Sequence, residues 1–329
     1  MSDAPRHIPV MLAEVLEALQ VRAGETYIDG TFGAGGYSRA ILESADCRVI
    51  AFDRDNTAVQ AAAAICQQFR SRLALINKPF SQMEEFARLE LMCEGMPEIS
   101  GPRAGGIVLD IGVSSMQLDQ AERGFSFQHD GPLDMRMSAE GMTAADFINT
   151  GLEETIANVI YEFGDERRSR AIAKAIVKER NLRPFTRTSE LADLVLRVFH
   201  GRKEDGRHPA TRTFQALRIH VNDELGELDA ALRASERLLK PGGRLVVVSF
   251  HSLEDRIVKK FLTERAGREP NASRYAPPQS IQSLCPSFRI VNTRPLTPSK
   301  GELDVNPRSR SARLRAAVRT EAPSWPADS

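Results

Sequence analysis

Short apolar runs alternate with amphipathic segments through residues 11–110 of the chain. Each run is nearly continuous in apolar residues and is followed by a polar or glycine-containing turn, as expected of a buried strand. Between the runs, apolar residues recur at the three-and-four spacing of a helix, for example at residues 12, 15, 16 and 19. Buried strands that alternate with helices indicate a parallel sheet covered on both faces. The four predicted strands are 26–28, 48–53, 73–76 and 106–110.

The pattern changes after residue 120, where the residues up to 210 contain no convincing strand. Helical spacing predicts helices near 143–149, 152–162, 166–181 and 188–199, followed by a long helix over 211–239. The turn residues of 240–243 (Lys-Pro-Gly-Gly) should stop that helix. Strands are then predicted at 244–250, 288–293 and 313–318. We further expect a long loop at 266–287 and a disordered tail at 321–329.

The order of these elements predicts a helical domain inserted between the fourth and fifth strands of an α/β domain. The predicted divisions are 1–118 and 213–329 for the two parts of the α/β domain and 119–212 for the insert. The chain has 329 residues, which is enough for two such domains.

Charge and cysteine content narrow the class of protein. The formal net charge is zero, so a case for nucleic-acid binding must come from local charge asymmetry. The four cysteines are scattered without a C-x-x-C pair, which argues against a metal site or a disulfide scaffold and favours a cytoplasmic location. We find no signal peptide and no apolar run of about 18 residues, so no membrane span is predicted.

A glycine-rich loop after the first strand is the segment most typical of a ligand site. It runs over residues 27–38 and carries glycines at 30, 33, 35 and 36, between a strand and a helix. Glycine lets a backbone approach a ligand closely, and the amides of the following helix start would face it. The spacing differs from the dinucleotide and P-loop motifs and resembles the S-adenosylmethionine loop of class I methyltransferases. The alternative is a simple turn between strand and helix.

Further candidates lie at the carboxyl ends of later strands, where open α/β sheets bind ligands. Asp53 could accept hydrogen bonds from ribose hydroxyls, or it could merely cap a helix. Phe80 could pack on an adenine ring, or it could fill the core. Asp110 ends a buried strand, where an unpaired charge is costly, and so calls for a ligand, a metal or a helix N-terminus. His251 lies in the polar segment after the fifth strand, with hydrogen bonding inside the protein as its alternative role.

Several longer motifs in the chain point in one direction. They are residues 29–36, 110–115 (DIGVSS), 122–127 (ERGFSF), 130–137 (DGPLDMRM), 208–215 (HPATRTFQ) and 249–256 (SFHSLEDR). Together they resemble the signature motifs of one family, the bacterial 16S rRNA cytosine-N4 methyltransferases of the RsmH (MraW) type. The resemblance covers about residues 6–319. One departure is visible, because Tyr37 stands where the family's glycine loop usually continues with histidine.

This resemblance implies a class I, Rossmann-like methyltransferase with a mostly parallel seven-stranded sheet and an inserted all-α domain. It implies methylation of the N4 amine of a cytidine in the decoding region of 16S rRNA, conventionally position 1402, within the small ribosomal subunit. It assigns S-adenosylmethionine as cofactor. Asp110 and His251 are the candidate catalytic residues, and no metal is expected. The implied cofactor contacts are Gly35, Gly36, Tyr37, Asp53, Phe80, Asp110 and Gln117, of which Gln117 and the Tyr37 side chain rest on the resemblance alone.

RNA contacts are expected from the insert, where residues 164–220 hold fourteen Lys and Arg against seven Asp and Glu. Arg167, Arg170, Lys174 and Lys178 are predicted to share one helix face, either as a phosphate-binding surface or as an ordinary solvated face. Rival functions are a methyltransferase for another RNA, a protein or a small molecule, and a non-catalytic ribosome-assembly factor. The sequence gives no sign of the oligomeric state, and a homodimer is kept as a hypothesis.

Overall fold

The computed structural model describes residues 8–92, 104–138, 140–202, 206, 208–268 and 284–326. The chain divides into two compact units, Met1–Gly112 with Leu225–Ser329, and Val113–Glu224. The predicted divisions were 118/119 and 212/213, and the two units divide at 112/113 and 224/225. Among the described residues, no helix has both the length and the apolar character needed to cross a membrane.

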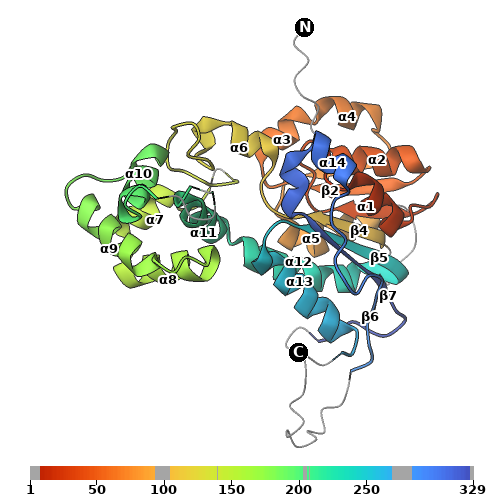
Figure 1. Ribbon diagram of the computed structural model, residues 1–329. Helices are drawn as coiled ribbons and strands as arrows, with labels where there is room; N and C mark the ends of the chain where they lie inside the picture. Colours follow the sequence, from red (N-terminus) through yellow and green to blue (C-terminus); the bar gives the residue numbers. More distant parts are fainter. Residues whose placement is uncertain are drawn as a thin grey trace, which may run out of the picture. The chain divides into compact units, whose positions relative to one another are not determined.

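The first unit contains a seven-stranded sheet with the order β3-β2-β1-β4-β5-β7-β6 (Figure 1). Strands β1 to β5 pair in parallel, whereas β7 pairs antiparallel with both β5 and β6. This sheet and the helical insert between β4 and β5 confirm the predicted fold class. The strands are β1 (Thr26–Asp29), β2 (Arg48–Phe52), β3 (Leu73–Ile76), β4 (Ala104–Asp110), β5 (Leu239–Ser249), β6 (Phe288–Ile290) and β7 (Arg313–Arg319).

Both faces of the sheet are buried, because successive side chains of each strand point to opposite faces. Ile107 and Leu109 of β4 pack in one core, and Val108 between them packs in the other. Helices of this unit cover those faces with apolar residues. The helices are α1 (Leu12–Leu19), α2 (Gly36–Ser44), α3 (Asn56–Ala61), α4 (Ala63–Gln68), α5 (Met83–Met92), α12 (Glu224–Leu238), α13 (Ser252–Arg265) and α14 (Lys300–Val305), of which α14 has no buried residue.

The second unit is helical and has its own core, formed by residues such as Phe147, Ile160 and Ile176. Its four central helices match the predicted ones closely. Its α-helices are α6 (Ser115–Asp119), α7 (Ala144–Thr150), α8 (Glu153–Gly164), α9 (Ser169–Arg180), α10 (Thr188–Val198) and α11 (Ala210–Asn222).

Three local predictions were wrong. The long helix over 211–239 is two helices, because Asp223 adopts a left-handed conformation with φ 47° and ends α11. The sequence over 58–69 predicts a single helix, whereas the structure has two, α3 and α4, which meet at Ala62. Part of the tail over 321–329 is ordered: the Trp325 indole lies 4.3 Å from the Arg265 guanidinium, and its Nε1 donates to the carbonyl of Cys285 at 2.9 Å. Most of the predicted loop at 266–287 lies outside the described residues.

Candidate active site

The carboxyl ends of four neighbouring strands bring the predicted acidic residues to one edge of the sheet. Asp29 ends β1, Asp53 follows β2 and Asp110 ends β4, while His251 follows β5. Because β2, β1, β4 and β5 are adjacent and parallel, these ends face the same side.

The glycine loop leaves no room for side chains at three of its positions. A Cβ added at Gly30 would lie 2.4 Å from the Leu109 side chain, and one at Gly36 would lie 2.2 Å from Pro9. Gly35 has φ 76° and caps α2, so a side chain there would be both strained and crowded. The loop is therefore a tightly packed backbone cradle that presents the first amides of α2.

Asp53 holds the loop from the neighbouring strand. Its Oδ2 accepts a hydrogen bond from the amide of Gly33 at 2.7 Å, and its Oδ1 accepts one from the amide of Asp55 at 2.7 Å. Burial raises the pKa of Asp53, and the two amide bonds counteract that rise. Each carboxylate oxygen has a second lone pair, so Asp53 can still accept hydrogen bonds from a ligand.

Phe80 begins a short 3₁₀ helix, Phe80–Gln82, and is half-buried against the core beneath the sheet edge. Its Cβ would lie 3.3 Å from a Cβ at Gly30. The Phe80 side chain thus starts beside Gly30 of the glycine loop and also contributes to the core.

The Tyr37 side chain is buried inside the protein. It is 4% exposed, and its hydroxyl donates to the carbonyl of Val10 at 2.5 Å. Burial raises the pKa of Tyr37 well above its usual value, with the neighbouring Asp110 as the next cause. The hydroxyl therefore anchors the N-terminal segment beside Asp110 and stays neutral at physiological pH.

Asp110 is the one predicted residue with a carboxylate oxygen that is buried and unpaired among the described residues. Its amide donates to Thr31 Oγ1 at 2.7 Å, which fixes the backbone, but its Oδ1 has no hydrogen-bond partner. The pKa of Asp110 is raised to about 8, mainly by burial and also by the nearby carboxylates of Asp29 and Glu254, while a hydrogen bond with Tyr37 lowers it. A buried acceptor without a hydrogen-bond donor lowers the stability of a protein unless a ligand donates a hydrogen bond to it.

Asp29 is a fully buried carboxylate that the sequence motif contained but to which we assigned no role. Its Oδ1 accepts from the amide of Thr31 at 3.1 Å, and its Oδ2 accepts from Ser38 Oγ at 2.7 Å. Burial raises the pKa of Asp29 to about 6. Asp29 therefore ties β1, the loop and α2 together and places a second negative charge near Asp110. Its position at the end of a continuous apolar run was the available signal.

His251 is the N-cap of α13 and is oriented by Glu254. The amide of Glu254 donates to His251 Nδ1 at 3.4 Å, and His251 Nε2 lies 2.9 Å from Glu254 Oε1 without the alignment of a hydrogen bond. Glu254 is completely buried, and its Oε2 accepts from the amides of Phe250 and His251 at 2.8 and 3.1 Å. Glu254 was missed as a site residue, although its place three residues after His251 is that of a capping box.

Gln117 belongs to the second unit, on α6. It is 7% exposed, and its Oε1 accepts a hydrogen bond from the amide of Ser114 at 3.0 Å. The segment from residue 110 to residue 117 crosses from one unit into the other, and both partners of this hydrogen bond belong to the second unit.

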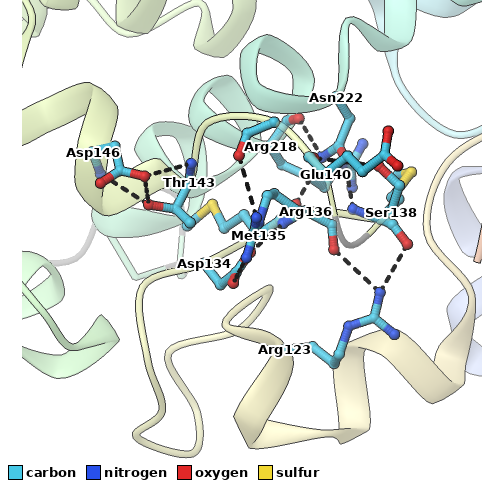
Figure 2. A network of polar contacts seen from close by, with 12 residues as sticks. Arg123, Asp134, Met135, Arg136, Ser138, Glu140, Thr143, Asp146, Arg218 and Asn222 are labelled. Carbon is cyan, nitrogen blue, oxygen red and sulfur yellow. Dashed lines mark hydrogen bonds and ion pairs between the residues drawn. The ribbon is translucent and has the colours of Figure 1, made fainter.

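Polar contacts hold the second half of the 130–137 motif in the second unit, and Figure 2 shows Asp134, Met135 and Arg136 within them. Arg136 pairs with both oxygens of Asp134 at 2.8 Å each. Asn222 on α11 accepts from the amide of Met137 at 2.8 Å and donates to the carbonyl of Met135 at 2.7 Å. Met135 is buried with φ 64°, so these contacts hold a strained backbone in place.

The residues at the sheet edge fit an S-adenosylmethionine-type cofactor. The crowded glycine loop supplies backbone amides, Asp53 has free lone pairs for hydroxyl groups, and the orphaned oxygen of Asp110 can accept from an ammonium group. This correspondence in donors and acceptors does not depend on any sequence motif.

Comparison with known proteins identifies the family. A model described as "MraW methylase family" matches residues 4–320. Proteins named "Ribosomal RNA small subunit methyltransferase H" are similar to the chain over nearly its whole length. That of Parvibaculum lavamentivorans is 55% identical, covering 99% of this chain and 93% of its own. That of Caulobacter vibrioides is 54% identical over 99% of each chain, and that of Rhodospirillum rubrum is 55% identical over 99% and 98%.

The family model leaves out only a few residues at each end of the chain, so it spans both parts of the sheet and the whole helical insert. The relatives share more than half of their residues with the chain over the same extent. The chain therefore belongs to the MraW methylase family.

Proposed function

We propose that this methyltransferase transfers a methyl group from S-adenosylmethionine to the N4 amine of a cytidine in the decoding region of 16S rRNA. The membership of the MraW methylase family supports methyl transfer, and the names of the relatives support small-subunit rRNA as the acceptor. The reaction belongs in the cytoplasm, where small subunits are made.

The observation that carries the proposal is the orphaned Oδ1 of Asp110 beside the glycine loop. A buried acceptor without a partner favours a ligand that brings a donor, and both the cofactor's ammonium group and the target amine are donors. We assign Asp110 first to the ammonium end of the cofactor. Backbone amides of the loop at Gly35 and Gly36, with Asp53 and Phe80, complete that side of the site.

The chemical difficulty lies in the acceptor. A cytosine amine is a weak nucleophile because its lone pair is conjugated with the ring, and the base must leave any stack before it can react. The bound cofactor supplies an electrophilic methyl group. Holding the amine in line with that group can supply roughly 7–11 kcal/mol of the barrier in favourable cases.

His251 is the second catalytic candidate, and its surroundings favour a contact with the base over removal of its proton. The Nε2 atom lies beside the Glu254 carboxylate, and the Nδ1 atom accepts a hydrogen bond from the Glu254 amide at the start of α13. Neither is arranged as an open proton acceptor. Glu254 then acts as the positioning residue that fixes the ring.

The rival functions differ in the acceptor or in the chemistry. A methyltransferase for another RNA, a protein or a small molecule would keep the same cofactor site but would leave small subunits unmodified. A non-catalytic assembly factor would bind subunits without methyl transfer. A homodimer stays a separate prediction, which light scattering of the purified chain tests.

The test is methyl transfer from labelled S-adenosylmethionine to small subunits from cells that lack this protein, compared with naked 16S rRNA. Mass spectrometry of nuclease digests should find N4-methylcytidine at the decoding site. The Asp110→Ala variant should show little transfer. If cofactor binds normally and neither RNA is labelled, the acceptor assignment is wrong.

A further inference from the structure

Two sets of cations in the helical unit differ in their surroundings, and the first set has a structural role. Arg180 donates to the carbonyls of Ile148 and Gly151 at 2.7 and 2.8 Å, so it satisfies the end of α7. Arg218 forms a bidentate pair with Glu224 at 2.7 and 2.9 Å. Because these guanidinium groups form hydrogen bonds and an ion pair inside the unit, they contribute little to the binding of a partner.

Exposed arginines around α10 are paired as well. Arg183 lies 2.5 Å from Glu190, Arg197 lies 3.3 Å from Glu179, and Arg187 pairs with Asp130. Each pair cancels a positive charge near the surface. The excess of basic residues in this part of the sequence is thus much smaller at the surface than the count of residues suggests.

The second set is a row of cations along α9 whose side chains are exposed. Arg170, Lys174 and Lys178 are exposed, as is Arg167 just before the helix, and none has a hydrogen bond or ion pair with any described residue. Arg167 was predicted within the helix, but α9 begins at Ser169. Together these four residues define the α9 face.

Helix stability does not explain this row. Cations four residues apart repel each other and weaken a helix. The helix dipole would favour Lys178 in the last turn, but it disfavours Arg170 in the first. The opposite side of α9 buries Ile172, Ala173 and Ile176, so the cations are not needed for packing either. Their presence therefore comes at some cost to the helix.

We propose that the α9 face binds the phosphodiester backbone of rRNA during substrate recognition. This inference rests on the proposed function and names the surface that serves it. Successive cations are about 6 Å apart along the helix axis, at 1.5 Å per residue, and so form a linear row of charge that can follow a phosphate chain.

The chemistry of the face favours RNA over an acidic protein. Among the described residues, no large apolar side chain is exposed within α9. Protein interfaces depend on buried aromatic and apolar anchors, whereas backbone binding to a nucleic acid needs positive charge. The α9 helix itself therefore offers a protein partner no such anchor, and the exposed apolar side chain next to it, Leu182, lies beyond its end.

The experiment compares three full-length variants with the wild type on undermethylated small subunits. The first combines Arg170→Gln, Lys174→Gln and Lys178→Gln. The second keeps the charge, with Arg170→Lys, Lys174→Arg and Lys178→Arg. The matched control neutralises three exposed cations of the sheet unit, Arg22→Gln, Arg70→Gln and Lys259→Gln.

The neutral α9 variant should bind subunits roughly 10- to 50-fold more weakly at physiological salt. The slope of log K against log salt should fall by about 2 to 3, at roughly 0.7 to 0.9 per lost phosphate contact. Its KM for subunits should rise with kcat and cofactor Kd unchanged, and its Tm should equal or exceed that of the wild type because the repulsion is relieved. The charge-keeping variant and the control should behave as the wild type.

Equal loss in the control variant, or an unchanged KM and salt slope in the neutral α9 variant, would overturn the inference. Loss in the charge-keeping variant would also count against it, since the phosphate contacts would still be available. Failure of the proposed function looks different, because the wild type itself would then transfer no methyl group to small subunits.

Discussion

Cofactor binding should depend steeply on pH, because Asp110 must be ionised to pair with the cofactor's ammonium group. Burial and, to a lesser extent, the neighbouring charge of Asp29 raise the pKa of Asp110 to about 8. At neutral pH most molecules without cofactor therefore carry a protonated, binding-incompetent Asp110. Binding must then release about one proton.

The magnitude follows from the fraction of Asp110 that is ionised. With a pKa near 8, roughly 0.3% is ionised at about pH 5.5 and roughly a quarter at about pH 7.5. Apparent affinity scales with the competent fraction, so the Kd should fall roughly 75-fold over this range, approaching ten-fold per pH unit. The range stops below about pH 8 because an α-amino group itself begins to lose its proton there.

Isothermal titration calorimetry of the cofactor product, S-adenosylhomocysteine, measures both quantities. Titrations in two buffers with different ionisation enthalpies give the protons released, and the same titrations give the Kd. The Asp110→Asn variant should bind weakly with a flat pH profile. The Asp29→Asn variant should shift the dependence to lower pH, because it removes a charge that raises the pKa of Asp110.

A wild-type Kd that changes less than about three-fold over the same range would refute the reasoning. If the Kd is flat while kcat/KM for the RNA rises about ten-fold per pH unit, Asp110 acts on the target amine and not on the cofactor. The stability of the protein without cofactor gives an independent check, because it should decrease with rising pH while the affinity for cofactor increases. The folded state holds more protons than the unfolded state between about pH 4 and about pH 8, so the free energy of unfolding without cofactor should decrease as the pH rises through that window.

Two further predictions concern stability. Asn222→Ala leaves the buried amide of Met137 and the carbonyl of Met135 without a partner. The free energy of unfolding should fall by about 2–4 kcal/mol, and the Met137 amide should exchange its hydrogen faster. A loss below about 0.5 kcal/mol would show that Asn222 does not hold this loop in place. Trp325→Ala removes the aromatic ring that lies over Arg265, so the free energy of unfolding, measured by thermal unfolding, should fall by about 1–2 kcal/mol. Trp325 is the chain's one tryptophan, so its fluorescence reports on the tail directly. An emission spectrum typical of a water-exposed tryptophan in the native wild-type protein would show that the tail is not packed against Arg265.

The sheet could be predicted from the sequence because its signal is local. Strands such as 48–53 and 106–110 are almost entirely apolar, and only a buried parallel strand suits that composition. The ends of such strands then point to the site, which is why Asp53 and Asp110 could be chosen from the order of residues alone. The start of β5 at Leu239 was missed, since Pro241 and Gly242 mark a turn in most contexts.

Other features depend on contacts that are distant in the sequence. Asp223 looks compatible with a continuous helix until its left-handed conformation separates α11 from α12. The tail looks disordered because its composition is polar, yet Trp325 finds Arg265 sixty residues earlier in the chain. Glu254 looks like a surface acid in a charged segment, but it is completely buried and orients His251. Burial of this kind is a property of the whole fold.

Contacts that are distant in the sequence also decide which charged side chains are available to a partner. The neutral net charge of the chain therefore says little about its ability to bind a polyanion. A count of residues treats every arginine as available. Arg180, however, donates hydrogen bonds to carbonyl groups inside the helical unit, and Arg218 pairs with Glu224. The cations of the α9 face, by contrast, keep their charge for a partner. A protein with no net charge can therefore bind a polyanion, because affinity for a phosphate backbone follows the number of unpaired cations that line up along it.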